Sequence, residues 1–324
     1  MDVRTAYEVL EVAGRAPSVH NTQPWRWLVG TRSLHLLADR TRAVPATDPH
    51  ERELLISCGA ALHHLRVALA SRGMGSSVRL LPNAEDPDHL AAIRLTGAAP
   101  RQVDVGLVDA VAGRRSDRRT YSDCLVPPAA VRLLVRRAHD EGAVLKPLDH
   151  PGEVDAVVDA AATAAATQEA DRAYGMEMLV WSGRGAGSDE GVLSAVSPRA
   201  PTGFDRRFPW GVLPSNDASA PRGGRLVVLA TLDDTRFAWL RAGAALSAVL
   251  LTATSLGLAS CTQSQPFEVS SSRAQLRERL LHGRAHPHLI VRVGHAPAGP
   301  LPPRTPRRRV REVAHPLPGV PTAR

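Results

Sequence analysis

The chain of 324 residues contains a single lysine, Lys146, although its formal net charge is +8. Arginine therefore supplies nearly all of the positive charge, and the arginines are scattered except in residues 304–311. A nucleic-acid-binding face needs clustered basic residues, often with aromatic residues between them. Aromatic residues make up only 4% of this sequence. The composition therefore argues against a nucleic-acid binder.

Cysteines and long apolar runs are also scarce. The three cysteines are widely spaced and odd in number, which fits neither a disulfide framework nor a zinc site: Cys58, Cys124 and Cys261. No continuous apolar run reaches the roughly 18 residues that cross a bilayer, and the first residues do not resemble a signal peptide. We therefore expect a cytoplasmic protein that does not associate with membranes.

Histidines do not form a convincing metal site. The spacing of His282, His286 and His288 is compatible with a metal, but no acid or thiol lies close by in the sequence, so solvated histidines are the better interpretation. His63 and His64 are expected on the surface of a helix. We predict no metal.

Hydrophobic periodicity and turn residues predict a mixture of helices and strands. Strands are predicted at residues 25–29, 33–38, 78–81, 90–95, 226–232 and 288–293. Helices are predicted at residues 4–14, 49–72, 103–112, 127–141, 154–181 (in two pieces), 235–256 and 271–282. Residues 182–224 lack periodicity, and a segment of that length is either functional or mobile.

The chain contains one internal repeat. The tetrads Gly-Ala-Ala-Leu at 59–62 and 243–246 are identical at a shift of 184, and a Ser-x-Gly follows each near the helix end. Both copies stand in a helix followed by an extended segment. We infer two related halves, residues 1–100 and 101–324.

Two arginine clusters suggest a phosphate site. Alternate residues of an extended segment point the same way, so Arg114, Ser116 and Arg118 can face one phosphate dianion. The alternative is a solvated basic patch. A second cluster lies at Arg304, Arg307, Arg308, Arg309 and Arg311, for which the alternative is a disordered basic tail.

A short polar loop completes the pattern. Pro17 and Pro24 enclose Ser18, Asn21 and Gln23, and two prolines stiffen a loop at low entropic cost. Such a loop can direct amides and hydroxyls at the edge of a heteroaromatic ring. The alternative is an ordinary connection between a helix and a strand.

Together these strings resemble the FMN-dependent nitroreductase family, and most closely its dormancy-associated Acg-like branch. The matching strings are residues 17–25, 114–118, 256–261 and 305–313. The resemblance implies an α+β nitroreductase-like fold and one non-covalent FMN. It also implies the FMN-binding residues Ser18, Asn21, Gln23, Arg114, Ser116, Arg118, Gly257, Ser260, Arg307 and Arg308, and assigns no catalytic residue.

The order of the strings indicates how the chain is organised. The family usually forms homodimers in which each site takes its phosphate motif from one subunit and its Ser/Asn loop from the other. Here the first half has kept the loop and the second half the arginine motif. The resemblance therefore implies an intramolecular pseudo-dimer, monomeric in solution, with one working site and one degenerate site.

The resemblance implies FMN binding more firmly than it implies turnover. The activity it suggests is NAD(P)H-dependent reduction of small aromatic acceptors, nitroaromatics or quinones. In the Acg-like branch a lid covers the flavin, and residues 182–216 have the length and composition of such a lid, with Phe204, Phe208 and Trp210 able to pack it down. The alternative function is storage or sequestration of FMN with little reductase activity.

Overall fold

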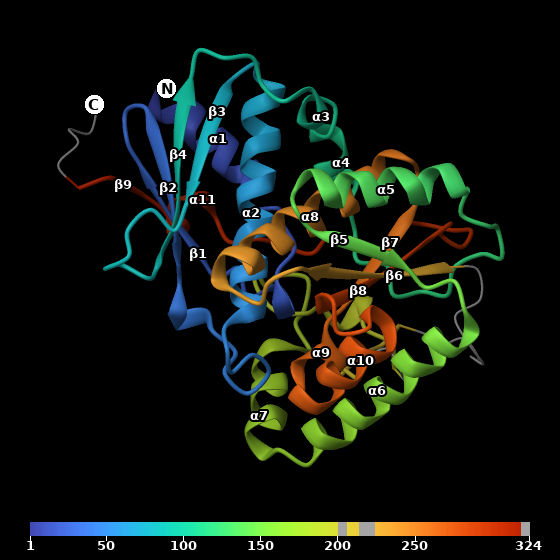
Figure 1. Cartoon of the computed structure of the whole chain (residues 1–324). Coiled ribbons are helices and arrows are strands. Elements are labelled where there is room, and N and C mark those ends of the chain that lie inside the picture. Colours follow the sequence, from blue (N-terminus) through green and yellow to red (C-terminus); the bar gives the residue numbers. More distant parts are fainter. Residues whose placement is uncertain (200–205, 214–223, 319–324) are drawn as a thin grey trace.

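The computed structural model describes residues 1–199, 206–213 and 224–318, and folds them around two antiparallel-rich sheets (Figure 1). The first sheet has the order β3-β4-β2-β1-β9, and its strands are β1 (Trp25–Val29), β2 (Ser33–Ala38), β3 (Gly75–Leu80), β4 (His89–Thr96) and β9 (Ala314–Pro316). The second has the order β5-β6-β8-β7, and its strands are β5 (Val144–Pro147), β6 (Gly224–Thr231), β7 (Ala259–Gln263) and β8 (His286–Gly294).

The helices lie against these sheets and between them. They are α1 (Val3–Ala13), α2 (Arg52–Ser71), α3 (Gln102–Val105), α4 (Val108–Gly113), α5 (Pro128–Asp140), α6 (Pro151–Glu169), α7 (Arg172–Trp181), α8 (Arg236–Ser255), α9 (Gln265–Glu268), α10 (Ser270–Leu281) and α11 (Val310–Val313). Three-residue 3₁₀ turns occur at Val19–Asn21, Arg40–Arg42 and Ser194–Val196.

The two sheets are covered differently. The first sheet packs one face on α1 and α2, which explains the strict alternation of half-buried and buried residues along β2. The second sheet has α5 and α8 on one face and α6 and α10 on the other. Strand β6 is buried on both faces, and its sequence is accordingly a continuous apolar run.

The two halves share one strand order. Read from β7, the second sheet runs β7-β8-β6-β5, which matches β3-β4-β2-β1 element for element, and every one of these neighbouring pairs is antiparallel. In each half the long helix, α2 or α8, follows the second strand in sequence. The second half differs by insertions, α6 and α7 before β6 and α9 and α10 before β8.

Helices α2 and α8 cross in the middle of the molecule and make reciprocal contacts (Figure 1). A Cβ on Gly59 would lie 2.1 Å from the carbonyl oxygen of Leu240, and a Cβ on Gly243 would lie 2.0 Å from that of Ile56. Gly59 corresponds to Gly243, and Ile56 to Leu240, at the same shift of 184 that relates the repeats. Gly59 thus contacts the counterpart of Ile56, and the counterpart of Gly59 contacts Ile56 itself. Such reciprocal contacts are the signature of a twofold relation.

Both central helices are long and apolar enough to cross a membrane by length and composition alone, which qualifies the expectation drawn from uninterrupted apolar runs. In α2, 89% of the apolar window is buried inside the protein, and in α8 78% is buried. Burial against each other and against the sheets accounts for their apolar character, since a helix that is hydrophobic all round belongs in a core.

Several elements differ from the sequence prediction. The helix expected from residue 49 begins at Arg52, because Glu51 adopts a left-handed backbone (φ 57°) that closes a turn first. The helix expected at 103–112 is broken at Gly106 into α3 and α4, and β5 was not predicted. Strand β9 comes from the C-terminal tail but pairs in parallel with β1. A boundary at residue 100 in the sequence therefore does not separate two bodies in space.

Candidate functional site

A strained loop between two prolines carries three of the predicted site residues. It connects α1 to β1, and three of its residues adopt left-handed backbone conformations, with φ of 45°, 56° and 52° at His20, Asn21 and Gln23. Such conformations cost free energy in residues other than glycine, so surrounding contacts must hold them. The Ser18 hydroxyl accepts a hydrogen bond from the Gln23 amide at 3.0 Å. The loop is therefore a fixed feature and not a simple connection.

The segment after α4 brings the predicted arginine motif to this loop. Ser116 lies beside Ser260 of β7 in a parallel bridge, and the Asp117 amide donates to the Ser260 carbonyl oxygen at 2.9 Å. This pairing keeps the segment extended. As a result Arg114, Ser116 and Arg118 line one cavity together with Ser18 and Asn21.

A neighbouring cavity of about 40 Å³ is lined by arginines without any described carboxylate. The five guanidinium side chains belong to Arg15, Arg114, Arg115, Arg304 and Arg307. Burial first, and neighbouring arginines second, lower the pKa of Arg114 to about 10 and that of Arg307 to about 9. Both remain protonated at neutral pH, and within the described residues neither Nε has a hydrogen-bond partner. Uncompensated buried cations require an anion.

The tail is ordered into this cavity by the first sheet. Strand β9 pairs with β1, and the preceding α11 buries Val313 in the first core. Arg307 donates to the carbonyl oxygens of Arg15 (3.2 Å) and Ala16 (3.1 Å) at the end of α1. The interpretation of a disordered basic tail is therefore wrong for residues 304–316.

Two adjoining cavities of about 80 and 100 Å³ extend from the arginines. They share Ser18, His20, Ser116, Arg118 and Phe208 in their linings, and the larger one reaches Glu53, Ser57 and Gln263. Burial raises the pKa of Glu53 to about 8, so this carboxyl holds a proton at neutral pH. Burial and the nearby Arg206 and Arg118 lower the pKa of His20 well below its usual value, so His20 is neutral.

Residues 189–196 and 208 cover these cavities. The Gln23 side-chain amide donates to the Asp189 carbonyl oxygen (2.8 Å), and that of Asn21 donates to the Gly191 carbonyl oxygen (3.2 Å). Arg42 forms an ion pair with Glu190.

Phe208 covers the inner end of the cavities. The Arg118 guanidinium lies 5.0 Å from the centre of its ring, and the His20 ring meets it edge-on at 5.9 Å. Phe204 falls outside the described residues.

Not all predicted residues line a cavity. Both polar atoms of the Gln23 side chain already have partners. Its oxygen accepts a hydrogen bond from the backbone amide of Arg308 (2.9 Å), and its nitrogen donates to the Asp189 carbonyl oxygen. Arg308 itself lies beside Asp39, at 3.5 Å. Gly257 (φ 74°) ends α8 as a left-handed cap, and Ser260 acts through its backbone. These four residues shape the site from outside the cavity linings.

Sequence reasoning missed other residues of the site. Glu53, Ser57 and His20 line the inner cavities, and Arg15 lines the arginine cavity, whereas Phe208, which also lines the inner cavities, was predicted to pack the lid. The Pro17-to-Pro24 loop contains His20, so that one had a local signal. Glu53 and Arg15 had none, because charged residues at helix ends usually face solvent.

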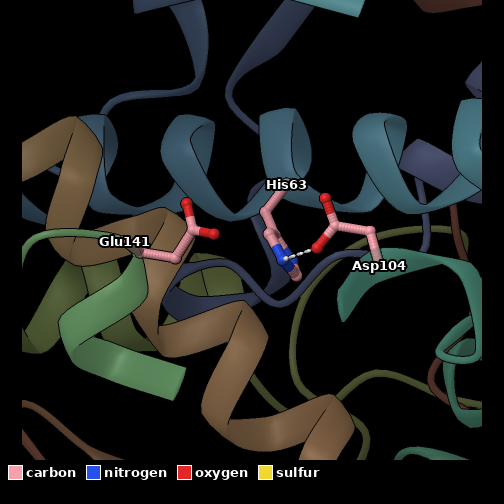
Figure 2. Close-up of side chains that lie close together, drawn as sticks. All are labelled: His63, Asp104 and Glu141. Carbon is pink, nitrogen blue, oxygen red and sulfur yellow. Dashed lines mark ion pairs between the residues drawn. The ribbon is translucent and has the colours of Figure 1, made fainter. Parts of the chain in front are cut away.

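His63, Asp104 and Glu141 lie close enough to suggest a metal site (Figure 2). The two carboxylates are, however, already compensated. Arg66 contacts both, at 2.9 Å and 2.7 Å, and Arg101 donates to Glu141 at 2.8 Å. With Arg137 also 3.8 Å from Asp104, three guanidinium groups face two carboxylates. A divalent cation would meet a net positive environment, so the cluster is an ion-pair network.

The expectation that His63 and His64 lie on the surface is wrong, since both are fully buried. Ser247 of α8 lies between their Nδ1 atoms, 2.7 Å from His63 and 2.8 Å from His64. His64 Nδ1 also lies 3.1 Å from the Ala60 carbonyl oxygen, which requires a proton on that nitrogen. Ser247 then donates to His63. Ser247 is the residue that corresponds to His63 in the repeat, so His63 is hydrogen-bonded to its own counterpart inside the protein.

The structure thus combines an α+β fold with an arginine cavity beside a covered polar loop. The chain matches the Nitroreductase family model over residues 216–295. It is 41% identical to Rv3131 of Mycobacterium tuberculosis, which carries a provisional NAD(P)H nitroreductase name, over 96% of this chain and 91% of the relative. The chain belongs to the nitroreductase family.

The chain is also similar to a further relative and to solved structures. The acg protein of M. tuberculosis, which also carries a provisional NAD(P)H nitroreductase name, is 36% identical over 94% of each chain, and places the protein among Acg-like members. A BluB-like flavoprotein from Clostridium difficile is 14% identical, with a TM-score of 0.44, over 65% of this chain and 98% of that one. A nitroreductase with bound FMN from Bacteroides fragilis is 17% identical, with a TM-score of 0.39, over 60% and 91%.

Proposed function

We propose that the chain binds one FMN, with its phosphate among the five arginines and its ring under the covering segment. The observation that carries this proposal is the arginine cavity. A phosphate dianion compensates cations that no described carboxylate neutralises, and guanidinium groups bind it through paired hydrogen bonds. The unpartnered Nε atoms of Arg114 and Arg307 fit the same demand.

Three groups of residues would hold the cofactor. Arg114, Arg307 and Ser116 would bind the phosphate, and Ser18, with the backbone of its loop, would contact the ring edge. Glu53 is a protonated carboxyl in the larger inner cavity, so it can donate a hydrogen bond to a ring acceptor. FMN, when bound, supplies hydride and single-electron chemistry, while the protein positions it and controls access.

We infer a fused pseudo-dimer with a single working site. The shared strand order and the reciprocal glycine contacts support two related halves, and the second half has no counterpart of the strained loop. Where that loop would stand, the Arg241 side chain fills the space over Gly142, and its Nε donates to the Glu141 carbonyl oxygen at 3.0 Å. We place the boundary between the halves at residue 100, except that β9, from the end of the second half, joins the sheet of the first half. The fusion implies a monomer in solution, and we propose a cytoplasmic location.

We propose NAD(P)H-dependent reduction of nitroaromatics or quinones as the activity. The second candidate is storage or sequestration of FMN, favoured by the covering contacts of Asp189, Glu190, Gly191 and Phe208. The inner cavities, at about 80 and 100 Å³, lie far below the roughly 300 Å³ at which ligand pockets begin. The covering residues 189–196 and 208, which we call the lid, must therefore move for a ligand to enter.

Absorbance spectroscopy tests both candidates. Purified protein, or protein reconstituted with FMN, should show a flavin spectrum at about one equivalent per chain, as one arginine cavity beside one strained loop implies. Bleaching by NADPH at turnover rates, with a nitroaromatic acceptor, supports the reductase. Bleaching by dithionite alone supports storage. Protein that does not take up FMN overturns the proposal, and two equivalents per chain overturn the single site.

A further inference from the structure

A cavity of about 660 Å³ lies outside the proposed FMN site, between α6, α7 and residues 207–211. One side of it is made by small side chains of α6, Ala161, Ala162 and Ala165. Opposite them stand Tyr174 and Met178 of α7, which belong to a buried cluster with Phe208. The space has the volume and the mainly apolar lining of a small-molecule pocket.

Trp210 lies in the lining of this cavity in a strained and exposed state. Its backbone is left-handed (φ 64°), and its side chain is 70% exposed. Gly183 makes room for the indole, because a Cβ there would lie 2.5 Å from Trp210 Cδ1. Strain and exposure of a large aromatic residue both cost free energy, and such costs gather at ligand sites.

Two cations stand at the rim without acidic partners. Arg199 and Arg207 line the cavity, both are exposed, and neither forms an ion pair with a described carboxylate. Their neighbour Arg206, by contrast, is buried against Glu268. Glu169 is the acid in the lining, so the rim keeps a net positive charge.

Phe208 is the common wall between this outer cavity and the inner ones. It lines all three, and its ring contacts Arg118 and His20 on the inner side. A ligand in the outer cavity would therefore touch the residue that covers the proposed flavin site.

We propose that the outer cavity is a second small-molecule site, which binds an aromatic carboxylate with its ring between α6 and Trp210 and its anion at Arg199 and Arg207. The apolar walls fit an aromatic body, and the two guanidinium groups, which form no ion pair with a carboxylate of the described residues, fit one anionic head. The site lies beyond the proposed FMN site and does not depend on it.

Isothermal titration with 2-naphthoate and with its neutral analogue 2-naphthamide tests the proposal on the full-length protein. We expect 1:1 binding of naphthoate. Ala162→Trp fills the cavity and should weaken binding about tenfold or more, the scale of one lost aromatic contact. Thr163→Trp adds the same indole on the opposite, solvent face of α6 and should change nothing.

The double variant Arg199→Gln/Arg207→Gln tests the anion. It should weaken naphthoate about threefold to tenfold, as for two exposed ion pairs, and leave naphthamide unchanged. The site is overturned if Ala162→Trp binds naphthoate as tightly as wild type does and has the same melting temperature as wild type. Equal loss of both probes in the arginine variant overturns the carboxylate assignment. No flavin is measured, so failure to bind FMN would leave these results standing.

Discussion

Arg114 and Arg307 are the two residues on which the proposed phosphate site depends most. Arg114 is buried, Arg307 is half-buried with its Nε fully buried, and other cations lie close to both, so that the pKa values of both are lowered. Arg307 is also tied by hydrogen bonds to the end of α1 and therefore keeps its position when the anion is absent. A preorganised guanidinium loses little entropy on binding, which makes it effective for an anionic ligand.

Arg307→Gln is therefore expected to weaken FMN binding by about 2–5 kcal/mol, or roughly 30- to 5,000-fold in Kd, as for truncation of one buried charged partner. Fluorescence titration of FMN measures it. Arg309→Gln, an exposed neighbour, is the matched control and should bind as wild type does. Equal affinity in both variants would place the phosphate elsewhere.

A second single residue, Glu53, is expected to make the free energy of unfolding depend on pH. Its pKa is about 8 in the folded chain and near 4.5 when exposed. Between pH 4.5 and 8 the unfolded state ionises while the folded state keeps its proton, so the free energy of unfolding falls as pH rises. Glu53→Gln should melt with a flatter dependence on pH from 5 to 8 than wild type. Glu85→Gln, on an exposed loop, should follow the wild-type curve; a Glu53→Gln curve parallel to wild type would contradict the neutral carboxyl.

At the scale of the elements, the crossing of α2 and α8 sets the relation between the two halves. Gly243→Ala places a methyl group 2.0 Å from a backbone carbonyl that cannot move aside easily. We expect a loss of about 1–3 kcal/mol or more from overpacking, measured by urea unfolding. Gly152→Ala, in α6 with open space around it, should be neutral or slightly stabilising. Unchanged stability in Gly243→Ala would show that the helices can separate without cost.

How far the sequence predicts these elements depends on where the determining contacts lie. Strands β1 and β2 matched their predicted bounds, because local alternation and the turn at 30–32 define them. Strand β9 could not be predicted, since its pairing with β1 is formed across nearly the whole chain. The start of α2 was wrong because one residue, Glu51, takes a left-handed backbone that nothing local requires.

The candidate site divides in the same way. The spacing of Arg114, Ser116 and Arg118 was visible in the sequence, because an extended segment places alternate residues on one side. Glu53, Arg15 and Phe208 join the site only through tertiary packing. The burial of His63 could have been inferred from the repeat, since contacts across a twofold relation bring a residue close to its own counterpart.

At the scale of the whole molecule, the lid decides between the two proposed functions. Among the described residues, the Arg42–Glu190 ion pair joins the lid to the first half by charge. Glu190→Gln removes that pair, and replacing 184–214 by a short Gly/Ser linker removes the lid. Both changes should speed NADPH oxidation by FMN-loaded protein if access limits the reaction, the linker variant more than the point variant.

The measurement is the rate of flavin bleaching by NADPH, compared with bleaching by dithionite. Glu85→Gln serves as the control for loss of one exposed carboxylate. Fast nitroaromatic turnover by the intact protein would contradict storage. A linker variant that keeps FMN and stays inert would mean that the site, and not its cover, prevents reduction.

The route of the tail has a consequence for biosynthesis. Arg304 and Arg307 reach the arginine cavity because β9, the last described strand in the sequence, pairs with β1 in the first sheet. A ribosome makes the lining residues between Arg15 and Ser116 long before Arg304, Thr305 and Arg307. A nascent chain stalled near residue 300 lacks part of the anion site, and it also lacks Val313 and Ala314 of the first core. If FMN binds at this cavity as proposed, its capture is a late event in the synthesis of each molecule, and only chains translated past Arg307 are expected to retain it.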